Sequence, residues 1–137
     1  MITATRAKSL RLANEDPISH PQHGRVLLYM ANMTLRPGRK CAIPLTIDSQ
    51  TVRGIVGSLR GLSVIDRALF GTIQFASDKA SQAWAKRWAD GFIGLDNLRL
   101  DFEILEGEQV PVGRSCRGEV GPFTLARRWS PICVVIK

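Results

Sequence analysis

The chain has 137 residues and a mass of 15.1 kDa, which is the size of one compact domain. Hydrophobic residues make up 45% of it and charged residues 23%, a balance that excludes a wholly disordered protein. No apolar run approaches the roughly 18 residues of a membrane-spanning helix. The first 17 residues also lack the apolar stretch of a secretory signal. We therefore expect neither a membrane span nor export.

The cysteines and histidines predict no metal site. Cys41, Cys116 and Cys133 are odd in number and show no CxxC spacing, which argues against a disulfide framework and against a zinc site. His20 and His23 are flanked by prolines, with no cysteine or acidic cluster nearby to complete a set of ligands. We expect no metal and no cofactor, and a reduced, intracellular setting.

The excess of positive charge is concentrated at the start of the chain. Residues 1–40 hold seven basic and two acidic groups, residues 41–91 six and four, and residues 92–137 six and six. Such a segment favours contact with an acidic partner or with nucleic acid, and a solubilising leader explains it equally well. The candidate partner-binding residues are Arg6, Lys8, Arg11, Arg36, Arg39 and Lys40.

The same segment predicts the domain boundary. Residues 1–23 contain few bulky apolar groups, too few to offset an ordering entropy of roughly 1–2 kcal/mol per residue. We therefore expect a basic, flexible N-terminal arm over residues 1–23 and a folded domain over residues 24–137. Deletion of residues 1–16 should then leave the stability of the domain unchanged.

The first half of the folded domain reads as strands. Residues 24–35 are mostly apolar, and residues 42–47, 51–59 and 62–76 form short alternating or β-branched runs separated by glycine, aspartate and serine. Runs of this length and spacing are typical of an antiparallel meander.

One helix follows, over about residues 77–90. Ser77 can cap its N-terminus, and Gly91 is placed to end it. Trp84 and Trp88 are four residues apart and so share one helical face. We expect this face to pack on the sheet, with both tryptophans buried in the core.

The remainder of the chain returns to strands. Residues 98–105 alternate between apolar and charged side chains, as a half-buried strand does. Residues 106–122 are rich in glycine and proline and read as a hairpin or loop, and residues 129–137 form a last apolar strand. The order of elements predicts an α+β domain built on a mostly antiparallel β-barrel flanked by a helix.

Three blocks resemble the prohead serine proteases of tailed bacteriophages. AIPLTIDSQTVRGIVGSL resembles a PLL-x-DH-D…GxV segment of that family. ALFGTIQFASDKASQAWAKRWADGFI resembles its L-x-x-x-x-FS strand, helix and DG-x-I turn, and RRWSPICVVIK resembles its RW-x-P-x-EVSLV strand. The blocks stand in the family's order over about 95 residues. The resemblance implies a β-barrel flanked by helices, related to the herpesvirus assembly proteases.

The resemblance also implies that the catalytic residues are missing. The family's histidine falls on Ser49, its nucleophilic serine on Asn97 and its acidic third member on Cys133. Asn97 cannot act as the nucleophile, and Ser49 cannot act as a general base at neutral pH. We expect Asn97 and Ser49 to lie within side-chain reach across neighbouring strands, with Cys133 close behind.

The implied function is that of a structural phage head protein, with a capsid-associated, decoration or assembly role, built on an inactivated protease fold. Its partners would be the major capsid protein or other head proteins and further copies of itself, in the virion or in the host cytoplasm during assembly. Two alternatives stay open. One is an active prohead maturation protease with a non-standard site, such as Ser49 or Cys133 activated by Lys40 or Lys137. The other is a basic nucleic-acid-binding β-barrel module.

Overall fold

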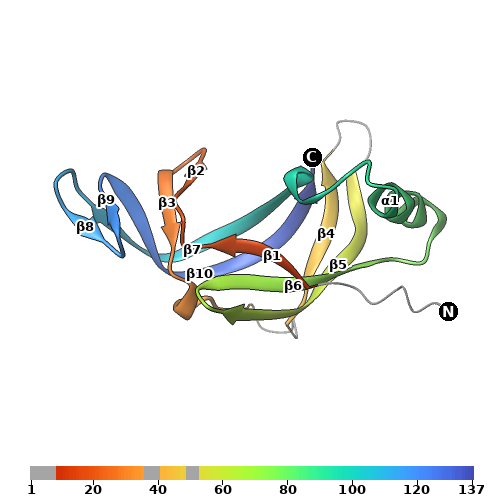
Figure 1. Cartoon of the computed structure of the whole chain (residues 1–137), viewed down its shortest axis with the longest axis horizontal. Helices are drawn as coiled ribbons and strands as arrows, with labels where there is room; N and C mark the ends of the chain where they lie inside the picture. The colour runs from red at the N-terminus through yellow and green to blue at the C-terminus, as the bar shows by residue number, and fades with distance from the viewer. Residues whose placement is uncertain (1–8, 36–40, 49–52) are drawn as a thin grey trace.

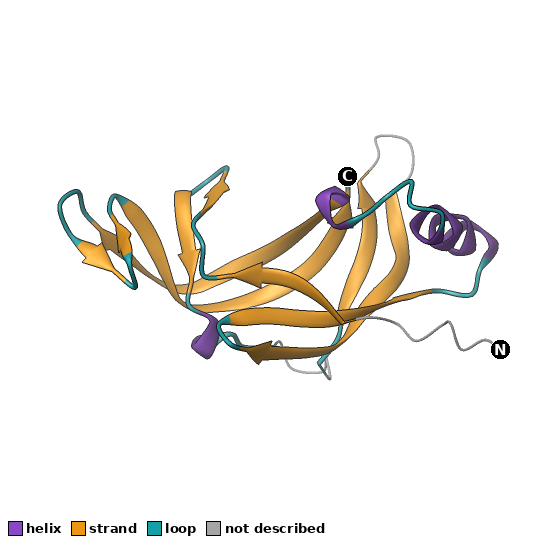
Figure 2. Ribbon diagram, viewed as in Figure 1, coloured by secondary structure: helices purple, strands orange, loops and turns teal. Residues whose placement is uncertain are grey.

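A computed structural model of the chain describes residues 9–35, 41–48 and 53–137. Within these residues strands predominate, with one α-helix and two short 3-10 helices (Figure 1, Figure 2). In chain order the elements are β1 (Ser9–Asn14), β2 (Ile18–His20), β3 (Gly24–Leu28), η2 (Met30–Asn32), β4 (Ile43–Asp48), β5 (Arg53–Ile65), β6 (Ala68–Phe75), α1 (Lys79–Ala89), η3 (Leu95–Asn97), β7 (Leu98–Val110), β8 (Ser115–Cys116), β9 (Glu119–Val120) and β10 (Phe123–Ile136).

Strand β10 is the centre of the main sheet. One of its edges pairs with β7 in antiparallel fashion along almost its whole length. The other edge pairs in parallel with β3 near its start and with β4 near its end. Two arms of the sheet therefore leave the same edge of β10: the short arm β3-β2 and the long arm β4-β5-β6-β1. The sheet curls along the long arm into a half-barrel (Figure 2).

The predicted meander is present as β4, β5 and β6, which are antiparallel neighbours. The boundary within it differs from the prediction, because β5 continues to Ile65 and turns at Asp66 and Arg67. Both of these residues have left-handed φ angles, 51° and 62°, as a two-residue type I′ turn requires. Position 57 requires glycine because β5 approaches β6 closely there. A Cβ atom at this position would lie 2.3 Å from the carbonyl oxygen of Gln74.

The predicted flexible arm over residues 1–23 is wrong from residue 9 onward. Strand β1 pairs with β6 from Ser9 to Asn14, and β2 pairs with β3. The prediction counted only the apolar surface of the segment itself. The segment gains order from backbone pairing to β6, which lies more than 50 residues further along the chain. Removal of residues 1–16 would therefore delete a strand of the sheet.

Helix α1 lies near one end of the molecule, and the β8–β9 hairpin projects from the other end (Figure 1). The helix is capped by Asp78 and not by Ser77, since the Asp78 carboxylate accepts the backbone N–H of Ser81 at 3.0 Å. Trp84 packs against the main core. The expected burial of both tryptophans is wrong, because both side chains are only half-buried and Trp88 also lies outside the core cluster. The helix therefore covers only a margin of the sheet.

The main core fills the inside of the half-barrel, and Trp129 of β10 is its largest fully buried side chain. The Trp129 indole N–H donates to the carbonyl oxygen of Tyr29 at 2.9 Å, and its ring meets Phe102 edge-on. A smaller cluster gathers Leu27, Phe123 and their neighbours beneath the hairpin end. The predicted terminal strand is thus the strand around which the core is built, and it begins earlier than expected.

The architecture is mostly β, with a curled half-barrel sheet and one helix, as the predicted barrel-plus-helix fold requires at this coarse level. Among the described residues, no helix has the length and apolar character needed to cross a membrane.

Candidate functional site

Asn97 ends the short helix η3, where its side chain has a structural task. The Asn97 amide oxygen accepts the backbone N–H of Gly94 at 3.0 Å, and its own carbonyl oxygen accepts the backbone N–H of Lys137 at 2.7 Å. The first bond closes the turn of η3, and the second ties this turn to the end of β10. The position matched to the family's nucleophile is therefore occupied by a group that holds the backbone in place.

Cys133 lies on β10 opposite Asp101 of β7. Its thiol donates weakly to the Asp101 carboxylate, with 3.8 Å between sulfur and oxygen. Burial raises the pKa of the Cys133 thiol, and the negative charge of Asp101 raises it further. Both effects disfavour the thiolate, which is the nucleophilic form of cysteine. The surroundings of Cys133 therefore oppose a nucleophilic role.

Of the two described positions of the matched triad, Asn97 ends η3, directly before β7, and Cys133 lies on β10, three residues away from the strand end that pairs with the start of β7. Asn97 directly precedes Leu98, which pairs with Ile136, whereas Cys133 pairs with Asp101. Ser49, the third position, lies outside the described residues, and so does Lys40. The expectation that the three side chains converge stays a prediction.

A groove of about 770 Å³ lies along the open side of the half-barrel. Its walls come from β1, from the β2 region and from the first part of β7. Apolar side chains and polar or charged ones both face it: Arg11, Leu12, Ala13, Asn14, Ile18, Ser19, His20, Pro21, Gln22, Leu28, Leu98, Arg99, Leu100, Asp101, Phe102 and Ile132. A concave site of this size and mixed lining suits a ligand or a short peptide.

His20 lines the groove, although the sequence predicts a flexible arm at this position. Its ring packs on Phe102 at 5.3 Å between centroids, and its Nδ1 accepts the backbone N–H groups of Gln22 and His23. As an acceptor, Nδ1 carries no proton, so the proton of the neutral ring is on Nε2. The contact joins positions 20 and 102, and no local sequence signal could have predicted it.

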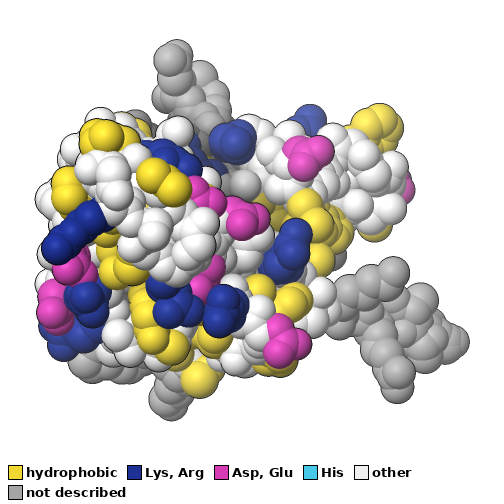
Figure 3. Space-filling model, turned by 60° about the vertical axis from the view of Figure 1, so that its left-hand side comes forward, with side chains coloured by type: hydrophobic (Ala, Val, Ile, Leu, Met, Phe, Trp, Pro, Cys, Tyr) yellow, Lys and Arg dark blue, Asp and Glu magenta, His cyan; other side chains and the backbone are white. Residues whose placement is uncertain are grey.

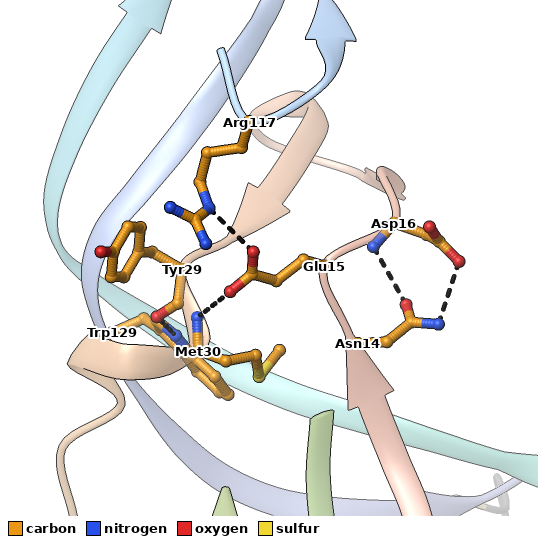
Figure 4. Close-up of polar contacts among 7 residues, drawn as sticks. All are labelled: Asn14, Glu15, Asp16, Tyr29, Met30, Arg117 and Trp129. Carbon is orange, nitrogen blue, oxygen red and sulfur yellow. Dashed lines mark hydrogen bonds and ion pairs between the residues drawn. The ribbon is translucent and has the colours of Figure 1, made fainter. Parts of the chain in front are cut away.

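The corner between β1 and β2 is fixed by a polar cluster around Glu15 (Figure 4). The Glu15 carboxylate accepts the guanidinium N–H of Arg117 at 2.8 Å and the backbone N–H of Met30 at 3.0 Å. The Arg117 guanidinium also stacks on the ring of Tyr29 at 4.2 Å. The turn between β8 and β9 thereby holds the corner that leads from one groove wall to the next.

Of the predicted partner-binding residues, only Arg11 belongs to the described part of the chain, and it lies in the groove wall. Arg6, Lys8, Arg36, Arg39 and Lys40 lie outside that part. On the face in Figure 3, basic and acidic side chains alternate with apolar ones and form no continuous basic field. No group of three or more potential metal ligands occurs in the described ranges.

Protein-family models, curated proteins and solved structures were all compared with the chain, and none of them matches it.

Proposed function

We propose that this chain is a non-catalytic structural protein of a phage head, with a capsid-associated, decoration or assembly role, built on an inactivated prohead-protease-like half-barrel. The observation that carries the proposal is that the two described positions matched to catalytic residues, Asn97 and Cys133, have surroundings unsuited to catalysis. The Asn97 amide oxygen accepts the Gly94 N–H within the turn of η3, and burial and the charge of Asp101 raise the pKa of the Cys133 thiol. The resemblance of the three sequence blocks supplies the phage context.

The same arrangement weakens the alternative of an active protease with a non-standard site. A cysteine nucleophile needs a base or a cation that stabilises the thiolate. Burial and the Asp101 carboxylate act in the opposite direction, and they outweigh the hydrogen bond with Thr46 and the charge of Arg99, so that the pKa of the Cys133 thiol is raised.

The ion pairs among the described residues count against the nucleic-acid alternative. Many described arginines pair with carboxylates: Arg25 with Glu119, Arg99 with Asp101, Arg117 with Glu15, Arg127 with Glu108, and Arg128 with Glu106. Each such pair would have to open before its arginine could neutralise a phosphate.

The experiment is coexpression of the chain with its cognate major capsid protein, followed by purification of the particles. We expect the capsid precursor to stay uncleaved by this chain and the chain to remain in the particles in a fixed ratio to the capsid protein. Cleavage of the precursor that is abolished by Cys133→Ala or Ser49→Ala would overturn the proposal. Absence of the chain from the particles and from their assembly intermediates would also overturn it.

A further inference from the structure

The half-barrel is open along one seam, and the two strands beside that seam are β1 and β7. The long arm runs β1-β6-β5-β4-β10, and β7 follows on the far side of β10. Among the described strands, β1 pairs with β6 alone and β7 pairs with β10 alone. Each strand therefore presents a second backbone edge without a strand partner among the described residues. Both strands also line the same groove.

On both strands beside the seam, half-buried apolar side chains alternate with exposed arginines. Leu12 of β1 and Leu98 and Leu100 of β7 are half-buried and pack against the main core. Their neighbours Arg11 and Arg99 are exposed. A strand lying between β1 and β7 would follow the same alternation, with every second side chain facing the core and the others facing the arginines.

The charges at the seam favour an acidic occupant. Arg11 and Arg99 are cationic and Asp101 is the one anionic side chain of the groove, so the lining carries an excess positive charge. Asp101 already accepts the Arg99 guanidinium at 2.9 Å. The ion pairs of the described residues do not include Arg11. Arg11 can therefore receive a carboxylate without losing an ion pair to another described residue.

We propose that the groove between β1 and β7 binds an extended peptide segment of a partner protein, in which apolar and acidic residues alternate, as an added β-strand. Backbone edges on both sides give the segment its hydrogen bonds, the leucines receive its apolar side chains, and Arg11 receives its carboxylates. The groove-lining parts of the two strands, residues 11–14 and 98–102, fit about four or five residues of extended chain. The proposal goes beyond the role in a phage head and does not depend on it.

The test is a titration of the full-length, ¹⁵N-labelled protein with a synthetic hexapeptide of alternating valine and aspartate, acetylated and amidated at its ends. We expect saturable NMR shift changes that centre on residues 11–14 and 98–102. Replacement of the aspartates by lysine should weaken binding at least fivefold, because Arg11 then repels the peptide. N-methylation of the two central residues should also weaken binding. Successive N–H groups of a strand point to opposite sides, so one methyl group blocks a hydrogen bond to β1 and the other blocks a hydrogen bond to β7.

Arg11→Glu is the matched protein variant, and Arg60→Glu on β5 is its control, since Arg60 is exposed but does not line the groove. We expect Arg11→Glu to weaken binding of the aspartate peptide at least fivefold and Arg60→Glu to leave it unchanged, with both variants folded by circular dichroism. Absence of shift changes at millimolar peptide, shift changes centred elsewhere, or equal binding of the lysine peptide would overturn the proposal. So would a dimer of the free protein that Arg11→Glu dissociates, because a second copy would then be the occupant.

Discussion

Arg117 and Glu15 lie 102 positions apart in the chain and form an ion pair 2.8 Å long between the β8–β9 turn and the β1–β2 corner. The Glu15 side chain is only 10% exposed and that of Arg117 23% exposed. Hydrogen bonding to Glu15 also holds the pKa of Arg117 above its ordinary value. The pair therefore links the projecting hairpin to the wall of the groove.

Loss of this pair should destabilise the protein. Arg117→Ala leaves the nearly buried Glu15 carboxylate with the backbone N–H of Met30 alone, so we expect a loss of about 1–3 kcal/mol in the free energy of unfolding. The measurement is urea denaturation followed by tryptophan fluorescence. Arg25→Ala is the control, because the Arg25–Glu119 pair is 45% and 32% exposed and should contribute less than about 1 kcal/mol. Equal losses in the two variants would contradict the assigned role of Glu15.

The helix cap gives a second prediction, with a control one residue away. Asp78→Ala removes the acceptor of the Ser81 N–H and hydroxyl groups, and it should lower the midpoint of thermal unfolding. Ser77→Ala should leave the midpoint unchanged, since Ser77 does not cap the helix. A larger effect at Ser77 would restore the cap that the sequence alone had indicated.

The Asp78 cap should also depend on pH. Hydrogen bonds from Ser81 hold the pKa of the Asp78 carboxyl below its ordinary value of 3.8. A carboxyl whose pKa is lower in the folded state stabilises the fold above its unfolded pKa and loses that contribution as the pH falls through the folded pKa. The difference in unfolding midpoint between wild type and Asp78→Asn should therefore be constant near neutral pH and shrink below about pH 4. Thermal melts across that range measure it.

Trp84 and Trp88 should differ although they share a helical face. Trp84 packs on the main core and Trp88 does not. A fully buried tryptophan costs about 3–5 kcal/mol when cut to alanine. Since both side chains are only half-buried, we expect about 2 kcal/mol for Trp84→Ala and about 1 kcal/mol or less for Trp88→Ala. Urea denaturation of the two variants checks this order, and a larger loss at Trp88 would contradict it.

Cys133 should resist alkylation. At pH 8 we expect iodoacetamide to modify it more slowly than the exposed Cys41, with peptide mass spectrometry as the readout and Cys41 as the internal control. The pH at which the Cys133 rate reaches half its maximum should lie above 9.0, the ordinary value for a thiol, because its pKa is raised. Asp101→Asn removes one cause of that shift and should accelerate the reaction. Faster labelling of Cys133 than of Cys41 in the wild type would contradict the description of a protected thiol.

The local elements could be predicted from the sequence, and the long-range contacts could not. Alternation within residues 98–105 and the Trp84–Trp88 spacing reflect periods of two and 3.6 residues, which a single segment displays by itself. The turn at Asp66 and Arg67 was missed because Asp-Arg is not a pair that favours left-handed φ angles, as Asn-Gly does.

The groove depends on contacts that no local pattern encodes. One wall is placed by the pairing of β1 with β6, in which Leu10 lies opposite Gly71, and another by the contact of the His20 ring with Phe102. The short polar segment over residues 9–20 reads as a flexible arm when its partner strands are unknown. Sequence patterns thus identified the strands that follow residue 23, but neither β1 nor the seam beside it.

The place of β10 has a consequence for the order of events during synthesis. Its partners β3, β4 and β7 all precede it in the chain, and it joins the two arms of the sheet. While a ribosome is still making residues 123–136, the emerged strands can form the β4-β5-β6 hairpins but cannot unite with β7 or β3. The nascent chain therefore exposes apolar edges until the end of this segment leaves the exit tunnel. Chaperone binding should be strongest in that interval and fall once β10 is released.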